Sequence, residues 1–284
     1  VLQSGHTIEV LEKYESEAEL AQAMKGVQAL IVRSDKVGAQ TIAQADDLKI
    51  IVRAGAGYDN IDLEAATKAG VVVMNTPGQN ANAVAELAIG LMIYMARNQF
   101  NPSTGGEIAG KTLGIQGFGN VGSLVAAKAL ALGMKVRAFD PVKSDEEMLV
   151  RGVEPTSSVK TLYADCDYIS LNLPLVTVTE RSVGYDLLSA MPKGGVLINT
   201  ARKEIVDESG LERALEERSD IKYASDVAPD NYAALREKFG LRVYANSKKM
   251  GAQTAEANLN AGLAAARQIV DYFETGNVKF QVNK

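Results

Sequence analysis

The strongest chemical signal in the chain is a glycine-rich hexapeptide, Gly117-Phe118-Gly119-Asn120-Val121-Gly122. Its pattern, G-x-G-x-x-G, is typical of turns that bind the pyrophosphate of a dinucleotide. The first glycine allows a tight turn, the second lets backbone approach the phosphates, and the third lets the next helix pack close to the strand. Unpaired N–H groups at the start of that helix favour an anion. An ordinary glycine turn is the alternative.

The segments around the hexapeptide favour the dinucleotide site. A short apolar run at 112–116 precedes it, and a helical apolar period follows it as far as Gly133. A second predicted strand at 135–139 ends at Asp140, 18 residues after the last glycine. A carboxylate there would accept hydrogen bonds from the adenosine ribose and repel a 2′-phosphate, which favours NAD. Lys143 nearby keeps NADP open as an alternative.

Two arginines, Arg33 and Arg53, stand where predicted strands end, and the second leads into Ala54-Gly55-Ala56-Gly57. In open parallel sheets, ligands gather beyond the carboxyl ends of the strands. Each arginine alone reads most simply as a solvated surface residue. Two guanidinium groups at equivalent strand ends, beside free backbone N–H groups, instead predict an anion site.

These residues lie among alternating strands and helices with short connections, a pattern that indicates parallel sheets covered on both faces. The abrupt start of the chain raises the expectation that an initial strand is missing from it. The predicted strands are 7–10, 29–32, 49–52, 71–74, 112–116, 135–139, 168–171, 196–199, 222–226 and 243–245. The predicted helices are 16–25, 40–45, 63–68, 82–96, 121–132, 158–164, 185–190, 208–217 and 255–273.

A break at Thr76-Pro77-Gly78 predicts a hinge between two domains. The helix at 82–96 is apolar nearly all round, which predicts burial between domains or between subunits. The long helix at 255–273 fits a return to the first domain. The predicted fold is α/β with two doubly wound parallel-sheet domains. The expected domains are 1–77 plus 255–284, and a Rossmann dinucleotide-binding domain, 78–254.

Composition narrows the possible functions. The 284 residues are 46% hydrophobic and carry a net charge of −5, which argues against a nucleic-acid or anionic-membrane surface. An anionic substrate must therefore be bound by a local group of arginines or lysines. The single cysteine, Cys166, excludes an internal disulfide. Without a visible signal peptide, the chain is expected to be a soluble cytoplasmic protein.

Six motifs carry a resemblance to a known family. In chain order they are VRAGAGYDNID, NTPGQNANAVAELAIGLM, LGIQGFGNVG, INTARKEIVDE, SDVAPD and KKMGAQTAEAN. Together they resemble the D-isomer-specific 2-hydroxyacid dehydrogenases, most of all the short phosphoglycerate dehydrogenases without C-terminal regulatory domains. The resemblance covers nearly the whole chain. It implies NAD as cofactor and a homodimer built largely from the nucleotide domains. It also implies that 1–77 plus 255–284 form a flavodoxin-like substrate domain, with a substrate cleft between the two domains.

The resemblance also assigns roles to individual residues. Arg202 corresponds to the arginine that orients the substrate carboxylate and carbonyl, and Asp226 to the aspartate that holds the nicotinamide carboxamide. Besides the hexapeptide and Asp140, the expected cofactor residues are Pro174, Thr200, Ala201 and Asp226. The expected substrate residues are Arg33, Ser34, Arg53, Ala54 and Gly55. No metal site is expected.

The sequence departs from the family at the catalytic histidine. Lys249 occupies the histidine position and Lys248 that of the preceding proline, while the only histidine, His6, is far away in the sequence. Asp230 is a loose match for the acidic partner. With an ordinary lysine pKa of about 10.4, roughly one amine in a thousand is unprotonated near neutral pH, a handicap of about 4 kcal/mol for alcohol oxidation. The alternatives are Lys248 as the working amine, or an inactive relative.

The sequence therefore predicts hydride transfer between C2 of a small anionic D-2-hydroxy acid and NAD. Arg202 is expected to bind the substrate, Lys249 to move the proton and Asp230 to orient Lys249. The favoured substrate is 3-phosphoglycerate, in serine biosynthesis, with its phosphate on Arg33 and Arg53. The alternatives are a glyoxylate or hydroxypyruvate reductase, and a non-catalytic scaffold that senses NAD(H).

Overall fold

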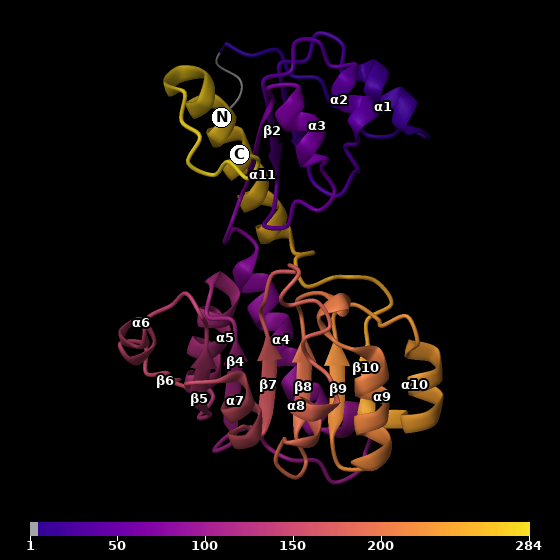
Figure 1. Cartoon of the computed structure of the whole chain (residues 1–284), viewed down its shortest axis with the longest axis vertical. Coiled ribbons are helices and arrows are strands. Elements are labelled where there is room, and N and C mark those ends of the chain that lie inside the picture. Colours follow the sequence, from indigo (N-terminus) through magenta and orange to yellow (C-terminus); the bar gives the residue numbers. More distant parts are fainter. Residues whose placement is uncertain (1–4) are drawn as a thin grey trace. The chain divides into compact units, whose positions relative to one another are not determined.

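The computed structural model describes residues 5–284 and divides the chain into two compact units (Figure 1). Unit 1 comprises the residues up to Asn80 together with Thr254–Lys284, and unit 2 comprises Ala81–Gln253. The boundaries expected from the sequence, after residue 77 and after residue 254, lie close to these divisions. None of the helices in the described part of the chain combines the length and apolarity needed to cross a membrane.

Unit 1 contains a parallel sheet of three described strands in the order β1-β2-β3. The register pairs Val32 with Arg53 and Arg53 with Asn75, so the three strands end at one edge. The strands are β1 (Ala29–Val32), β2 (Ile50–Arg53) and β3 (Val72–Asn75). The helices are α1 (Glu17–Ala23), α2 (Ala39–Ala43), α3 (Leu63–Lys68) and α11 (Ala255–Thr275).

Two details of unit 1 differ from expectation. Residues 7–10 were expected to form a strand but do not, and Ile8 and Val10 are exposed. In the described sheet the edge strand β1 pairs only with β2, so residues 7–10 have no strand as a hydrogen-bonding partner. Helix α11 carries Leu259, Leu263, Ala266, Val270 and Phe273 on one apolar stripe, yet Leu259 is 62% exposed and Phe273 is 41% exposed. Instead Ala261, Ala265 and Ile269 pack against β2 and β3, since small side chains let the helix approach the sheet closely.

Unit 2 is built on a parallel sheet in the order β10-β9-β8-β7-β4-β5-β6. The strand order reverses between β4 and β7, and ligands of such sheets bind outside the carboxyl ends of the strands at this switch point. The strands are β4 (Thr112–Gln116), β5 (Lys135–Phe139), β6 (Glu154–Pro155), β7 (Tyr168–Leu171), β8 (Val196–Asn199), β9 (Lys222–Ser225) and β10 (Val243–Ala245).

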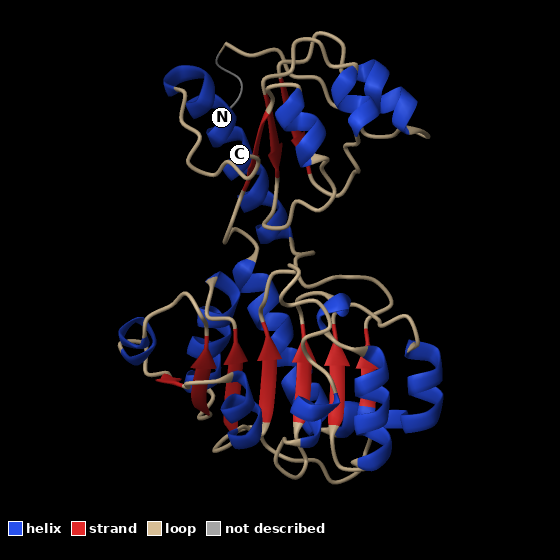
Figure 2. Ribbon diagram, in the orientation of Figure 1, coloured by secondary structure: helices blue, strands red, loops and turns tan. Residues whose placement is uncertain are grey.

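Helices cover both faces of this sheet (Figure 2). Alternate strand residues supply the two cores: Val196 and Ile198 face one side, and Leu197 faces the other. The helices are α4 (Ala81–Ala96), α5 (Asn120–Ala131), α6 (Asp145–Leu149), α7 (Val159–Asp165), α8 (Tyr185–Ser189), α9 (Glu208–Glu217) and α10 (Tyr232–Phe239).

Helix α4 is buried within unit 2. It packs on α5 and on the sheet, and Met92 and Met95 are fully buried in that core. The sheet and α5 thus account for part of the apolar surface of α4, and its predicted place between domains or between subunits stays a prediction.

Candidate active site

The predicted site residues of unit 2 follow successive strands along one edge of its sheet. Because all the strands are parallel, the segments after their carboxyl ends lie side by side at that edge. From β5 to β10 the edge spans five strand intervals, about 24 Å at the usual strand spacing. In spatial order the residues are Asp140 after β5, 117–122 after β4, Pro174 after β7, Thr200, Ala201 and Arg202 after β8, Asp226 and Asp230 after β9, and Lys248 and Lys249 after β10.

The glycine turn has the three features that its pattern predicted. Gly117 has φ +92°, in the region that favours glycine, and a Cβ there would lie 2.7 Å from the Asn172 carbonyl oxygen. A Cβ on Gly122 would overlap the Gly117 carbonyl oxygen, so only glycine lets α5 start this close to β4. A Cβ on Gly119 would meet nothing within 4 Å. Open space therefore lies over Gly119 at the N-terminus of α5, where the pattern predicts a pyrophosphate.

Asp140 is held beside this turn by backbone donors. Its Oδ2 accepts from Phe118 N–H at 2.7 Å, and its Oδ1 accepts from Val142 N–H at 2.9 Å and Lys143 N–H at 3.2 Å. A carboxylate has about four acceptor positions, so capacity remains for a ribose hydroxyl. The Lys143 ammonium lies 3.0 Å from Glu147, which does not favour the alternative of a 2′-phosphate ligand.

Gly119→Ala should separate cofactor binding from folding. Gly119 is the N-cap of α5 with φ −83°, which alanine also adopts, so we expect a loss of about 1 kcal/mol in the free energy of unfolding from the poorer cap. The added methyl would occupy the space over the turn and raise the Kd for NADH at least about tenfold. Thermal melts and fluorescence titration measure the two effects. Gly262→Ala, which also adds a methyl to open space but on α11, should leave the Kd unchanged.

The segment that carries Arg202 is fixed by a buried asparagine. Asn199 is 1% exposed; its Oδ1 accepts from Ala201 N–H at 3.0 Å and its Nδ2 donates to the Arg202 carbonyl at 2.9 Å. Near this segment, Thr200 Oγ1 and Asn172 Oδ1 are buried with no hydrogen-bond partner in the described structure. Buried polar atoms without partners are rare, and a bound ligand would satisfy them.

Asp230, the predicted partner of Lys249, pairs with another lysine in the structure. Its side chain is 79% exposed, and its Oδ1 accepts from Lys203 Nζ at 2.5 Å. This contact raises the pKa of the Lys203 ammonium. Glu208 accepts from the Asp230 N–H at 2.8 Å, which fixes the backbone as well. These contacts hold the loop after β9 against Lys203, and the role of Asp230 beside Lys249 stays a prediction.

Asp226 is buried and engaged by the chain itself. The side chain is 1% exposed, and its oxygens accept hydrogen bonds from Asn246 Nδ2, Met250 N–H and Gly251 N–H. A carboxylate offers about four acceptor positions, so these contacts use most of them. The predicted hydrogen bond from a nicotinamide carboxamide would have to use the remaining acceptor position of the Asp226 carboxylate.

Lys248 and Lys249 are both exposed, on the segment that joins β10 to α11. The structure therefore does not choose between the two amines by burial. Their place in chain order still puts Lys249 next to Met250 and Gly251, the two residues that Asp226 binds.

In unit 1, the predicted anion residues Arg33, Ser34 and Arg53 lie at the carboxyl edge of the sheet. The Arg53 guanidinium lies against Gly55, where a Cβ would overlap its Nη1. The N–H groups expected to be free are not: Ala54 donates to the Val32 carbonyl and Gly55 to the Arg53 carbonyl, each at 2.8 Å. A substrate carboxylate would have to use other donors of this segment.

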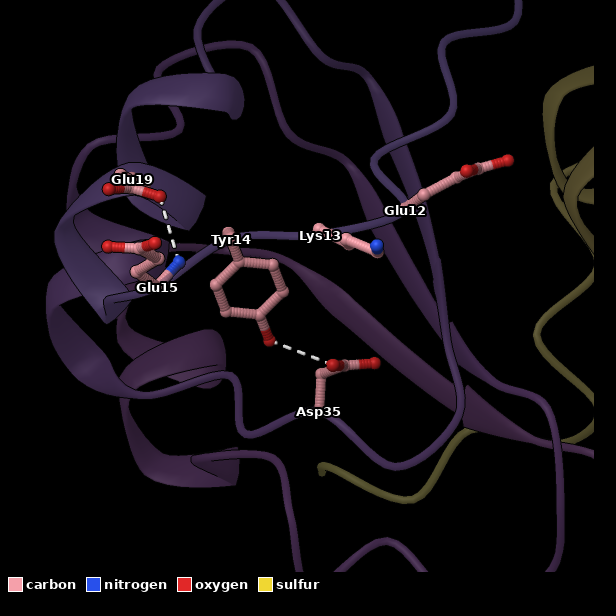
Figure 3. Close-up of a pocket in the computed structure, with 6 residues that line it drawn as sticks. All are labelled: Glu12, Lys13, Tyr14, Glu15, Glu19 and Asp35. Carbon is pink, nitrogen blue, oxygen red and sulfur yellow. Dashed lines mark hydrogen bonds between the residues drawn. The ribbon is translucent and has the colours of Figure 1, made fainter.

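A pocket of about 840 Å³ in unit 1 does not fit an anionic substrate (Figure 3). The Tyr14 hydroxyl donates to Asp35 Oδ1 at 2.9 Å. Burial raises the pKa of Tyr14, and the hydrogen bond to Asp35 raises it further. Four carboxylates and one ammonium would repel a phosphate or carboxylate. The lining residues are Glu12, Lys13, Tyr14, Glu15, Glu19 and Asp35. The described residues contain no group of three or more metal-binding side chains.

Comparison with known proteins shows that the chain is similar to one family of enzymes along nearly its whole length. Residues 1–283 match the catalytic domain of the D-isomer specific 2-hydroxyacid dehydrogenases. Hydroxypyruvate reductase from Thermotoga maritima is 36% identical over 288 residues, 95% of this chain and 92% of that protein. D-3-phosphoglycerate dehydrogenase from Rattus norvegicus is 36% identical over 299 residues, all of this chain and 56% of the relative.

Among solved structures, NAD⁺-bound 3-phosphoglycerate dehydrogenase from Entamoeba histolytica has a TM-score of 0.91 and 46% sequence identity, covering 99% of this chain and 90% of that one. The chain spans only about half the length of the curated phosphoglycerate dehydrogenases that it matches, 51% for that of Methanocaldococcus jannaschii.

Proposed function

The chain belongs to the D-isomer-specific 2-hydroxyacid dehydrogenase family, and on this premise we propose that it transfers hydride between C2 of a D-2-hydroxy acid and NAD. The observation that carries the proposal is the row of site residues along the carboxyl edge of the unit 2 sheet. The row begins with the ribose-binding Asp140 and the glycine turn, and ends with Arg202 and Lys249.

The residues of this row have distinct tasks. Asp140 holds the ribose, and the backbone over Gly119 receives the pyrophosphate. The bound nicotinamide supplies the hydride acceptor or donor. Arg202 orients the substrate carboxylate and carbonyl through its fork of N–H donors. During oxidation Lys249 takes the proton of the substrate hydroxyl as hydride leaves C2; during reduction the ammonium returns a proton to the oxygen.

For the substrate we propose 3-phosphoglycerate, the assignment that also places the protein in serine biosynthesis. Support comes from Arg33 and Arg53 at the edge of the unit 1 sheet and from the phosphoglycerate dehydrogenases among its relatives. Hydroxypyruvate is the competing substrate, because the Thermotoga maritima reductase is equally similar and matches over most of its length. A screen of 2-keto and 2-hydroxy acids, with and without phosphate and with both nicotinamide cofactors, distinguishes them. We further propose that the protein is a cytoplasmic homodimer, and the molar mass measured by light scattering tests whether it is a dimer.

Arg33→Ala should weaken binding of a phosphorylated substrate selectively. Loss of a guanidinium–phosphate contact removes about 1.5–3 kcal/mol, so we expect KM for 3-phosphoglycerate to rise by about tenfold or more. KM for a short unphosphorylated acid such as glyoxylate should change less than twofold. Steady-state kinetics on both substrates measure the difference. An equal change for the two would remove the phosphate assignment from Arg33.

A further inference from the structure

One buried carboxylate fixes the segment that carries Lys249. Asp226 Oδ1 accepts from Met250 N–H at 2.9 Å, and its Oδ2 accepts from Gly251 N–H at 3.0 Å. These donors belong to the first and second residues after Lys249. Two N–H groups bound by the two oxygens of a single carboxylate define the path of this backbone, because neither can leave without losing a charge-assisted hydrogen bond.

Asp226 is itself held by hydrogen bonds of its carboxylate and of its backbone. Asn246 donates to Oδ1 at 3.0 Å and accepts from the Tyr244 hydroxyl at 2.9 Å. The Asp226 backbone N–H donates to the Asn199 carbonyl at 2.9 Å. Asn199 is the residue whose side chain binds the backbone of Ala201 and Arg202. Asp226 thus connects the segment of Lys249 to the segment of Arg202 through described hydrogen bonds.

Packing around Gly251 supports the same role. A Cβ on Gly251 would lie 2.8 Å from Asp226 Oδ2 and 3.4 Å from Leu87 Cδ2. Gly251 therefore packs closely between the Asp226 carboxylate and Leu87 of α4. Any side chain at this position would displace the loop from Asp226.

We propose that Asp226 is a positioning residue, whose carboxylate sets the placement of Lys249 relative to Arg202. This inference rests on the proposed function and departs from the role that the family resemblance implied, a direct bond to the nicotinamide carboxamide. Asparagine has nearly the shape of aspartate, yet it replaces one acceptor by an NH₂ donor, which would face an N–H group of the loop. The structure thus explains why a carboxylate, and not an amide, stands here.

Asp226→Asn tests the proposal by two independent readouts. Hydrogen exchange of a peptide spanning 247–252 should become at least several times faster in the variant, because one of the two N–H groups, that of Met250 or that of Gly251, loses its acceptor. Asparagine keeps one acceptor oxygen, so one of the two loop N–H groups loses its bond, and we expect kcat to fall about 100-fold, the usual cost of misplacing a catalytic group by about 1 Å. The Kd for NADH, measured by fluorescence, should change less than about threefold.

Gly251→Ala gives a second test that leaves the carboxylate intact. It should reproduce the faster exchange and the lower kcat, with little change in the Kd for NADH. Gly262→Ala, a methyl added to open space on α11, is the matched control and should resemble the wild type in all three measurements.

The opposite results are equally clear. Unchanged exchange of 247–252 in Asp226→Asn would overturn the proposal, and so would a tenfold weaker Kd for NADH with kcat retained, since that pattern indicates a direct contact with the cofactor. If the wild type turns over no 2-hydroxy or 2-keto acid, the proposed function fails. The exchange measurement still decides whether Asp226 orders this loop.

Discussion

Replacing Lys249 by methionine should lower kcat for oxidation of a D-2-hydroxy acid by about 10³–10⁴-fold, the upper range of what a general acid–base residue contributes. Methionine keeps the length of the side chain and removes the amine, so the proton of the substrate hydroxyl loses its acceptor. The Kd for NADH should stay within about twofold, because the predicted cofactor residues belong to the segments after β4, β5, β7, β8 and β9, whereas Lys249 follows β10. Stopped-flow reduction of NAD⁺ and fluorescence titration measure the two quantities.

Lys248→Met is the matched control, since it removes the neighbouring exposed amine from the same segment. We expect kcat within about threefold of the wild type. If Lys248→Met carries the large loss and Lys249→Met does not, then Lys248 is the working amine. If neither lowers kcat, no lysine of this loop transfers the proton.

Arg202→Met should lower kcat/KM by about 10³-fold, equivalent to about 4 kcal/mol. The guanidinium can donate two parallel hydrogen bonds to the substrate, each worth about 1.5–3 kcal/mol when the groups are charged. Arg202→Lys keeps the charge without the fork and should recover at most about tenfold. Steady-state kinetics with the acid of highest turnover measure both.

Arg213 supplies the control for Arg202. It pairs with Glu217 on α9 and is 60% exposed, so Arg213→Met should leave kcat/KM within about twofold. If kcat/KM falls less than tenfold in Arg202→Met, another residue orients the substrate.

Local patterns predicted the framework of unit 2. The strands β4, β5, β7, β8 and β10 begin and end where expected, because each is a short segment with strand-forming residues between turn residues. The three glycines behave as their spacing required, since a G-x-G-x-x-G turn depends on steric contacts within one strand–helix unit. Helix α6 was missed although Ser144 and Glu147 form a capping box, a signal that the sequence contains.

What the sequence could not provide depends on contacts between distant segments. The pair of Lys203 and Asp230 joins residues 27 positions apart, and only the neighbouring loops after β8 and β9 bring them together. Asp226 meets Met250 and Gly251 for the same reason, across β9 and β10. The expected strand at 7–10 failed because alternation predicts an extended segment but cannot supply its hydrogen-bonding partner.

The most direct test of lysine-based proton transfer is the pH dependence of kcat/KM for oxidation by the wild-type protein. An amine base gives a rate that rises with pH to a midpoint at least one pH unit above 6.5, and Lys249→His should move that midpoint down toward 6.5. A wild-type midpoint near 6.5, unchanged in Lys249→His, would contradict Lys249 as the base.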